Sequence, residues 1–315
     1  MKRIAFSLAL VAILVTGLVA QEASAPEVVK FTVKRPGVGD VATRATNQTI
    51  DLQLDMDMGE MGGQQSMVQK MEFADSRTCT VLEAKGDSVT KFKVAYQKMK
   101  GTMKMEAAML PEPMEQDLLE GRNPAGETYV FTVTDGGLTI TNEEGEEASG
   151  EMREMLSSME WTDNRLGAWS PSMADLTEKR EISVGETITV SREKALSFVP
   201  QQNRAQLGDD ANVSMELTLK ETTMSLGAKV AVFDSKLKIT GTPGAEEGMA
   251  MELSMEMTGT MTVGVDNMWV YSSKMKGPMK MEGGSAEMGM QMTGNGNMVL
   301  DALAVYSKAK PAEAK

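Results

Sequence analysis

The sequence predicts a mainly β protein, built as one antiparallel curved sheet or as two related β halves, with two or three short helices packed on or between them. Over much of the 315-residue chain, apolar and polar residues alternate with period two. This places every second side chain on one face of an extended strand. Glycine-rich turns separate the alternating segments, as in antiparallel hairpins. Methionine fills 30 positions while aromatic residues make up 4%, so we expect its adaptable thioether to fill the core.

We expect residues 1–20 to be a cleaved secretory signal peptide. Two basic residues precede an apolar run over residues 4–20, which ends in small residues at Ala20, the pattern of such peptides. Cleavage near Ala20 would deliver the mature chain to the periplasm or the extracellular space, with no membrane span. Residues 21–35 are expected to form a leader with one short strand at 28–33.

Residues 36–183 are predicted to form a first β half with central helices. The alternation places strands at residues 46–58, 67–73, 78–82, 89–96, 98–106, 129–134 and 138–141. Three short helices are expected at residues 111–120, 151–160 and 170–179. The first would close at Gly121, the second has methionine and leucine along one face, and the third would be capped by Ser170.

Residues 184–305 are predicted to form a second β half, followed by a disordered tail at 306–315. Its strands are expected at residues 186–191, 213–224, 229–240, 249–265, 269–281, 288–293 and 297–305. The strand at 249–265 has methionine on its odd positions and acidic or hydroxyl residues on its even ones. At about 3.3 Å per residue it would span roughly 55 Å, so Gly259 is expected to mark a bend or bulge.

The hairpin formed by residues 249–265 and 269–281 has a predictable register. Their methionines are all at odd positions, so directly opposed residues must have an even sum if both sets face one side. A three-residue loop at 266–268 satisfies this condition. It would set Ser254 opposite Lys280 and place Glu256 diagonal to Lys276 and Lys280.

Two segments suggest an internal repeat. Residues 98–106 read KMKGTMKME and residues 274–282 read KMKGPMKME. The opening Val38-Gly39-Asp40 also recurs as Val184-Gly185-Glu186. An internal duplication would explain both matches. Independent strands of similar sequence, in a chain rich in methionine and lysine, would explain them as well.

Composition excludes several kinds of function. The net charge is −13, and loss of the two basic residues of the signal peptide leaves 30 basic against 45 acidic residues. Such a chain repels nucleic acid and anionic lipid surfaces. Histidine is absent and Cys79 is the single cysteine, which removes the usual general base, an intramolecular disulfide and a cysteine-rich zinc site. We predict a non-enzymatic protein with no catalytic residue, cofactor or metal site.

The methionine face of the strands has three interpretations. It can be a packed core, as for any apolar residue. It can be an adaptable surface that holds an apolar small molecule or a lipid. It can also bind Cu(I) or Ag(I), since soft thioethers select Cu(I) and neighbouring strands could supply converging sulfurs. The residues predicted to line a ligand are Met99, Met103, Met105, Met249, Met251, Met255, Met257, Met261, Met275, Met279 and Met281.

The order of these features resembles a family of secreted, methionine-rich bacterial β proteins of unknown function. The features that carry the resemblance are the signal peptide, the opening at Val38, the helix at 151–160, the second opening at Val184 and the strand around Thr258–Met261. The resemblance covers most of residues 31–301 and implies a role outside the cytoplasm. The family has no catalytic residues that could be assigned to positions in this chain. This chain continues the second opening with Thr187 and Ile188, where an aromatic residue is usual. A looser architectural likeness is to periplasmic lipoprotein carriers of the LolA type.

Overall fold

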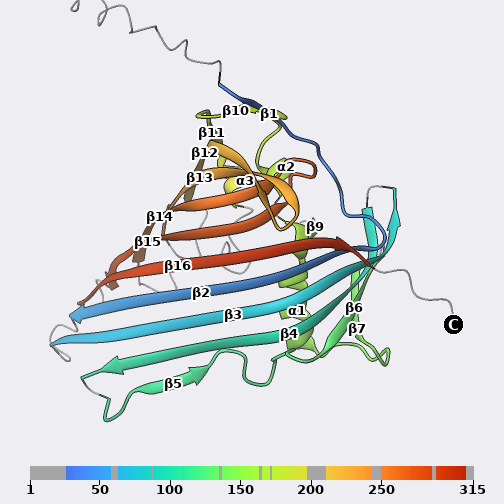
Figure 1. Ribbon diagram of the computed structural model, residues 1–315. Coiled ribbons are helices and arrows are strands. Elements are labelled where there is room, and N and C mark those ends of the chain that lie inside the picture. The colour runs from blue at the N-terminus through green and yellow to red at the C-terminus, as the bar shows by residue number, and fades with distance from the viewer. Residues whose placement is uncertain are drawn as a thin grey trace, which may run out of the picture.

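One antiparallel sheet of twelve strands dominates the computed structural model (Figure 1). The model describes residues 26–57, 63–86, 88–108, 110–134, 137–162, 165–170, 172–196, 211–242, 250–285 and 289–309. Predictions for the signal peptide, for Met249 and for the last residues of the tail lie outside these ranges. Across the sheet the strands are β11 (Thr187–Val190), β12 (Asn212–Ser225), β13 (Ala228–Gly241), β14 (Ala250–Gly264), β15 (Val270–Ser285), β16 (Met290–Lys308), β2 (Asp40–Asp57), β3 (Gln64–Lys85), β4 (Ser88–Ala107), β6 (Thr128–Thr134) and β7 (Gly137–Asn142), with β5 (Met114–Asp117) pairing on β4.

The mainly β, antiparallel prediction is therefore confirmed. The two predicted halves share this single sheet, because β16 pairs with β2 along its whole length, from Gln291 opposite Asp57 to Lys308 opposite Asp40. The division at residue 184 stays a prediction. Two further pairs lie outside the large sheet: β1 (Val28–Lys30) with β10 (Glu181–Ser183), and β8 (Trp161–Thr162) with β9 (Arg165–Leu166).

Three long strands replace pairs of shorter predicted ones. β3 continues through residues 74–77, because Asp75 and Arg77 both face the sheet interior and form an ion pair at 2.9 Å. β4 continues past residue 97 through a register shift opposite Ser76 and Arg77, which is how a bulge keeps a strand in its sheet. β16 runs from residue 290 to 308, so it crosses the predicted loop at 294–296 and enters the predicted tail.

In the described part of the chain, the helices are short. The predicted helix at 151–160 is confirmed as α1 (Gly150–Glu160), with Leu156 fully buried. The predicted helix at 170–179 is wrong in its bounds. There, Gly167–Trp169 forms a 3-10 turn, and α2 (Met173–Leu176) begins where Asp175 accepts a 2.7 Å hydrogen bond from the Ser172 N–H. A further helix, α3 (Arg192–Ala195), precedes β12.

The predicted helix at 111–120 is wrong. The segment contains β5 and a turn instead, with Met105 of β4 opposite Met114. Two causes favour the extended form. Pro113 disfavours a helical conformation at Glu112, and the open edge of β4 offers unpaired backbone groups. Gly121 still adopts the left-handed φ of +75° that its predicted role requires, but it closes a turn.

The β14–β15 hairpin keeps most of the predicted register. Ser254 lies opposite Lys280 as predicted. The same register sets Glu256 diagonal to Lys276 and Lys280 as predicted, and its ion pair, at 2.9 Å, is with Lys236 of β13. The loop covers residues 265–269, because the register shifts between Thr262 and Val263. The predicted bulge at Gly259 is therefore misplaced. A Cβ at Gly259 would collide with the Lys274 carbonyl oxygen, so this glycine permits a close backbone approach.

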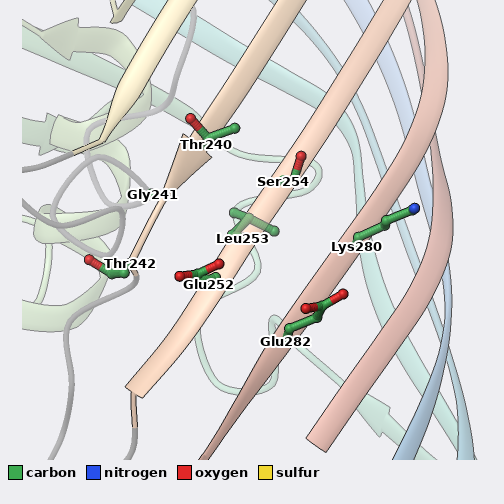
Figure 2. Close-up of a pocket in the computed structure, with 8 residues that line it drawn as sticks. All are labelled: Thr240, Gly241, Thr242, Glu252, Leu253, Ser254, Lys280 and Glu282. Atoms are coloured by element: carbon green, nitrogen blue, oxygen red, sulfur yellow. The ribbon is translucent and has the colours of Figure 1, made fainter.

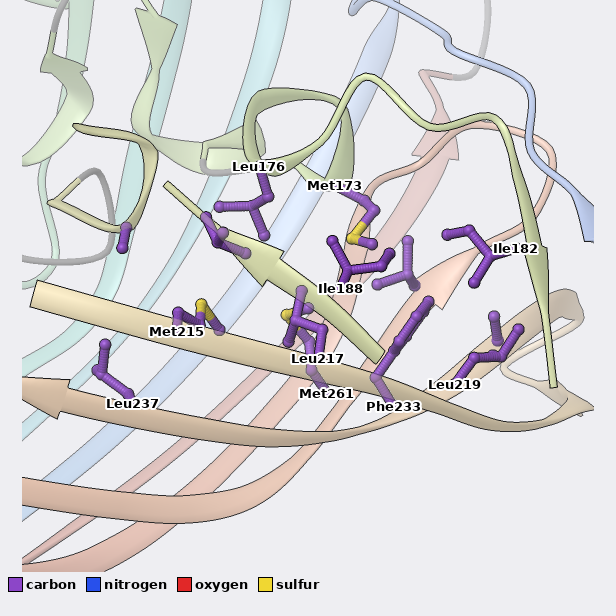
Figure 3. Packing of buried hydrophobic residues seen from close by; sticks show 14 of the residues in the cluster. Met173, Leu176, Ile182, Ile188, Met215, Leu217, Leu219, Phe233, Leu237 and Met261 are labelled. Carbon is purple, nitrogen blue, oxygen red and sulfur yellow. The ribbon is translucent and has the colours of Figure 1, made fainter. Parts of the chain in front are cut away.

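All helices pack on one face of the sheet, which we call the inner face (Figure 1). One buried cluster joins Met215, Leu217, Phe233 and Met261 of the sheet to α2 (Figure 3). A second cluster joins Phe92 and Phe131, stacked at 4.6 Å, to Leu156 of α1 and to Trp169 and Trp269. These clusters close one end of the inner face.

Candidate ligand-binding face

The exposed fraction of inner-face side chains changes along single strands, because other elements cover only part of that face. On β14, Met257 and Met261 are 2% and 1% exposed, whereas Met251 and Met255 on the same side are only partly buried. A strand places these side chains on one face by its period of two. The difference therefore arises from what lies above the sheet, and not from the direction of the side chains.

The neighbouring strands β3 and β4 show the same division. Cys79 and Val81 on β3 are each 1% exposed under the helices, while Met67 and Met71 on that face remain partly exposed. On β4, Phe92 is fully buried, while Met103 is partly exposed. We call the partly exposed apolar part the methionine surface. Its residues are Ile50, Leu52, Leu54, Met67, Met71, Met103, Met105, Met251, Leu253, Met255, Met279, Met281 and Met292.

The methionine surface has a small packed centre. Leu52, Leu54 and Met279 are 5%, 7% and 8% exposed and form one cluster. Gly294 of β16 lies between them, and a Cβ there would approach Leu54 Cδ2 to 2.8 Å and Met281 Cβ to 3.2 Å. Glycine at this position thus allows branched and thioether side chains from two strands to meet. The centre is fixed, and the thioethers around it are free to adjust.

The structure sorts the predicted ligand-lining methionines into two groups. Met257, Met261 and Met275 are buried in the core cluster that includes α2, and Met99 is buried on β4. On the methionine surface lie Met103, Met105, Met251, Met255, Met279 and Met281. A ligand role for any of them stays a prediction.

Sequence reasoning missed the part of this surface contributed by β2, β3 and β16. Ile50, Leu52 and Leu54 alternate along one side of the strand predicted at 46–58, but nothing in the sequence placed them beside Met279 and Met281. That neighbourhood depends on β16, which pairs with β15 on one side and with β2 on the other. The alternation of Met67 and Met71 was a signal that could have included β3.

A buried ionic cluster lies under the C-terminal end of α1. Arg77 NH1 lies 2.9 Å from Asp75 Oδ2, and Arg77 Nε lies 2.9 Å from Glu160 Oε1 at an angle that gives an ion pair without a linear hydrogen bond. The Tyr96 hydroxyl donates to Glu160 Oε1 at 3.0 Å. Burial raises the pKa of Glu160 and the nearby Arg77 lowers it in part, with a net rise. Burial also raises the pKa of the Cys79 thiol well above its usual value.

A shallow hollow lies on the polar face of the sheet, opposite the inner face (Figure 2). It opens where β13 ends and β14 begins and has a volume of about 350 Å³. Leu253 is its apolar contact, and the rest of its lining is polar, with Glu252 opposite Glu282 and Ser254 opposite Lys280. These side chains alternate along their strands with the inner-face methionines, so the hollow is not part of the methionine surface.

No helix in the described ranges is both long and apolar enough to cross a bilayer. Within the same ranges, no group of three or more histidine, cysteine or acidic side chains could hold a metal ion. Thioether sites fall outside that test.

No protein-family model and no curated protein matches the sequence. Among solved structures, a chain from a study of lipid–protein interactions in lipovitellin aligns with 88% of this chain at 9% identity and a TM-score of 0.37. This chain spans 26% of the lipovitellin chain. A candidate exported protein with a YmcC-like fold from Bacteroides fragilis aligns over 84% of this chain and 96% of its own, at 9% identity and a TM-score of 0.20. Both likenesses are distant and assign no family.

Proposed function

We propose that this chain is a non-enzymatic exported protein that holds an apolar ligand on the methionine surface. The observation that supports the proposal is the change in exposure along one face of β14, from 1% at Met261 to partial exposure at Met255 and Met251. Full burial of a large apolar side chain contributes about 1.5–3 kcal/mol. A ligand that covers the part of a thioether still open to solvent would gain a fraction of this, roughly 0.5–1 kcal/mol per side chain.

Methionine suits such a surface because its three rotatable bonds let it re-pack around guests of different shape. A non-enzymatic role agrees with the absence of histidine and with the burial of Cys79, whose raised thiol pKa disfavours the nucleophilic thiolate. Export rests on the signal-peptide pattern of residues 1–20, and on the proposed resemblance to secreted methionine-rich proteins.

Native mass spectrometry of the protein exported by its own host tests the proposal. We expect a co-purifying apolar molecule, and displacement of it by the fluorescent apolar probe N-phenyl-1-naphthylamine. Met71→Gln should weaken probe binding about fivefold, from the loss of roughly 1 kcal/mol. Met224→Gln is the matched control, because Met224 is 68% exposed on β12, away from this surface.

Equal probe affinity in Met71→Gln and Met224→Gln would contradict the proposal. So would the absence of any bound molecule together with no probe binding. That result would favour a structural protein whose methionines serve only as a packed core.

A thioether site for Cu(I) or Ag(I) is a second candidate, favoured by the strand register. Met71 lies directly opposite Met103, and Met255 directly opposite Met279. Opposed residues on neighbouring strands have Cβ atoms about 5 Å apart, close enough for two sulfurs to share a soft ion. Titration with Cu(I) against a competing chelator tests this. Binding weaker than micromolar would exclude the site.

A further inference from the structure

The methionine surface continues along β2 into a polar band. Beyond Ile50, the next inner-face residues on β2 are Gln48 and Thr46, both partly exposed. Phe73 of β3 and Leu300 of β16 lie on either side of Gln48 and are also partly exposed. The apolar surface therefore extends to this row. Gln48 and Thr46 therefore begin a polar band on this part of β2.

Arg44 follows Thr46 on the same face of β2 and is partly exposed. Its guanidinium donates through NH1 to the backbone carbonyls of Gly167 and Ser170, the latter at 3.4 Å. Among the described residues, no ion pair links Arg44 to a carboxylate. The hydrogen-bond acceptors of Arg44 are thus uncharged carbonyls, and a guanidinium has five N–H donors.

Arg44 belongs to a group of two arginines and two carboxylates, with Arg77, Asp75 and Glu160. Arg77, which lies directly opposite Arg44 in the sheet, pairs with both Asp75 and Glu160. Arg44 also acts on Glu160, because burial raises the pKa of that carboxyl and Arg44 lowers it in part, without forming an ion pair with it. Tyr306 also lies near Arg44, which lowers the phenol pKa in part while burial raises it. Arg77 is the arginine that contacts both carboxylates, whereas the Arg44 guanidinium is partly exposed and donates to backbone carbonyls.

We propose that the ligand is a single-chain amphiphile with an anionic head, either a carboxylate or a phosphate monoester. Its hydrocarbon chain would lie on the methionine surface, and its head would accept hydrogen bonds from Arg44. This proposal rests on the proposed function. Arg44 and Ile50 are six residues apart on one strand, about 20 Å, and an extended chain with its head near Thr46 covers much of that distance. Arginine suits such a head because its fork of donors matches carboxylate and phosphate oxygens.

The acidic character of the chain favours a single amphiphile over an anionic bilayer. The net charge of −13 repels a negatively charged membrane surface as a whole. A single anion at a local cation avoids that long-range repulsion, because the Debye length in physiological salt is about 8 Å.

Three ligands with the same chain test the proposal: hexadecanoic acid, hexadecyl phosphate and hexadecanol. Each is titrated at about pH 8 by displacement of N-phenyl-1-naphthylamine, below its micellar concentration. We expect the wild-type protein to bind at least one anionic ligand about tenfold or more tightly than the alcohol, since hydrogen bonds to charged groups are the stronger kind. Comparison of the acid with the phosphate identifies the head.

Arg44→Gln should remove this preference and leave hexadecanol affinity within about twofold, since only the charge-assisted contact is lost. Arg122→Gln is the control, because Arg122 is exposed and contacts the Leu118 carbonyl. Thermal unfolding of each variant reports on the fold. Equal binding of acid, phosphate and alcohol by wild type would overturn the head-group proposal while the proposed function stands. Equal weakening of all three by Arg44→Gln would show a structural role for Arg44 and also overturn it. Binding of none would overturn both proposals.

Discussion

Replacement of Arg77 by methionine should reduce the free energy of unfolding by about 3–5 kcal/mol at neutral pH, the cost of breaking a buried ion pair. The Arg77 guanidinium lies 2.9 Å from both Asp75 Oδ2 and Glu160 Oε1, and Glu160 is 0% exposed. Without Arg77, both carboxylates stay buried without the cation that contacts them, and Arg44 compensates the charge of Glu160 only in part. The Tyr96 hydroxyl, at 3.0 Å from Glu160, would be the remaining donor to that carboxylate.

The loss should depend on pH in a defined direction. Burial raises the pKa of Glu160 above its ordinary value of 4.5, and removal of Arg77, which lowers it, would raise it further. The folded state then binds more protons than the unfolded state between the two pKa values, so stability falls as pH rises through that window. The destabilisation of Arg77→Met should therefore be largest at neutral pH and shrink toward pH 4.5. Adding Glu160→Gln should recover part of it, because a neutral amide removes one uncompensated buried charge.

Urea unfolding followed by tryptophan fluorescence measures these changes, since Trp169 and Trp269 lie in the cluster that covers Arg77. Arg122→Met is the control for loss of an arginine at an exposed site, and should change stability by less than about 0.5 kcal/mol. A deficit below about 1 kcal/mol for Arg77→Met would refute the ion-pair argument. An equal deficit at about pH 5 and pH 8 would refute the assignment of the pH dependence to Glu160.

Three further predictions follow from buried or tightly approached groups. Gly259→Ala should destabilise the sheet by about 1–3 kcal/mol, because its Cβ would collide with the backbone of β15, and an unchanged melting temperature would contradict this. Asp40→Asn should lower stability by about 1–3 kcal/mol, because Asp40 Oδ1 lies 2.9 Å from Lys308 Nζ and its side chain is 3% exposed; wild-type urea unfolding would count against it. Cys79 is 1% exposed, so a thiol reagent should label it only after unfolding, and rapid labelling of the native protein would show that the burial is wrong.

Strand faces could be predicted from the sequence because the period of two is local information. The parity argument placed Ser254 opposite Lys280 correctly, since it needed only the methionine positions of two consecutive strands. It failed at the loop, where Met268 takes a left-handed φ of +58°. A non-glycine residue in that region is uncommon, and no sequence pattern signals it.

Polar residues inside strands caused the main errors. Asp75 and Arg77 interrupt the apolar face of β3, so the strand was divided there. Their mutual ion pair and Glu160 satisfy them in the interior, and Glu160 comes from a helix more than 80 residues away in the sequence. A buried ionic pair of this kind cannot be recognised until the helix is placed on the sheet.

The two turns of the predicted repeat have the same hydrogen bonds. The Gly37 N–H donates to Asp40 Oδ2 at 2.8 Å, and the Ser183 N–H donates to Glu186 Oε2 at 2.9 Å. Gly39 and Gly185 have φ of +78° and +87°. Each donates its N–H to a carbonyl of the strand that follows the one it opens, Val81 of β3 and Leu219 of β12. This equivalence supports the internal duplication on grounds independent of composition. The nine-residue segments agree less well, since Gly101 contacts Leu118 and Leu119, whereas Gly277 approaches the Glu256 carbonyl.

The division of the inner face separates stability from binding along individual strands. Met261 is 1% exposed within the covered core, so its truncation to alanine should cost about 2–5 kcal/mol of stability, as for other buried large side chains. Met255 lies six residues away on the same face and is partly exposed, so its truncation should cost much less in the free protein. If the methionine surface holds a ligand, Met255→Ala should instead weaken the stabilisation that ligand binding gives, since only the folded state binds. If the methionines served the core alone, Met255→Ala would leave the stabilisation by ligand unchanged.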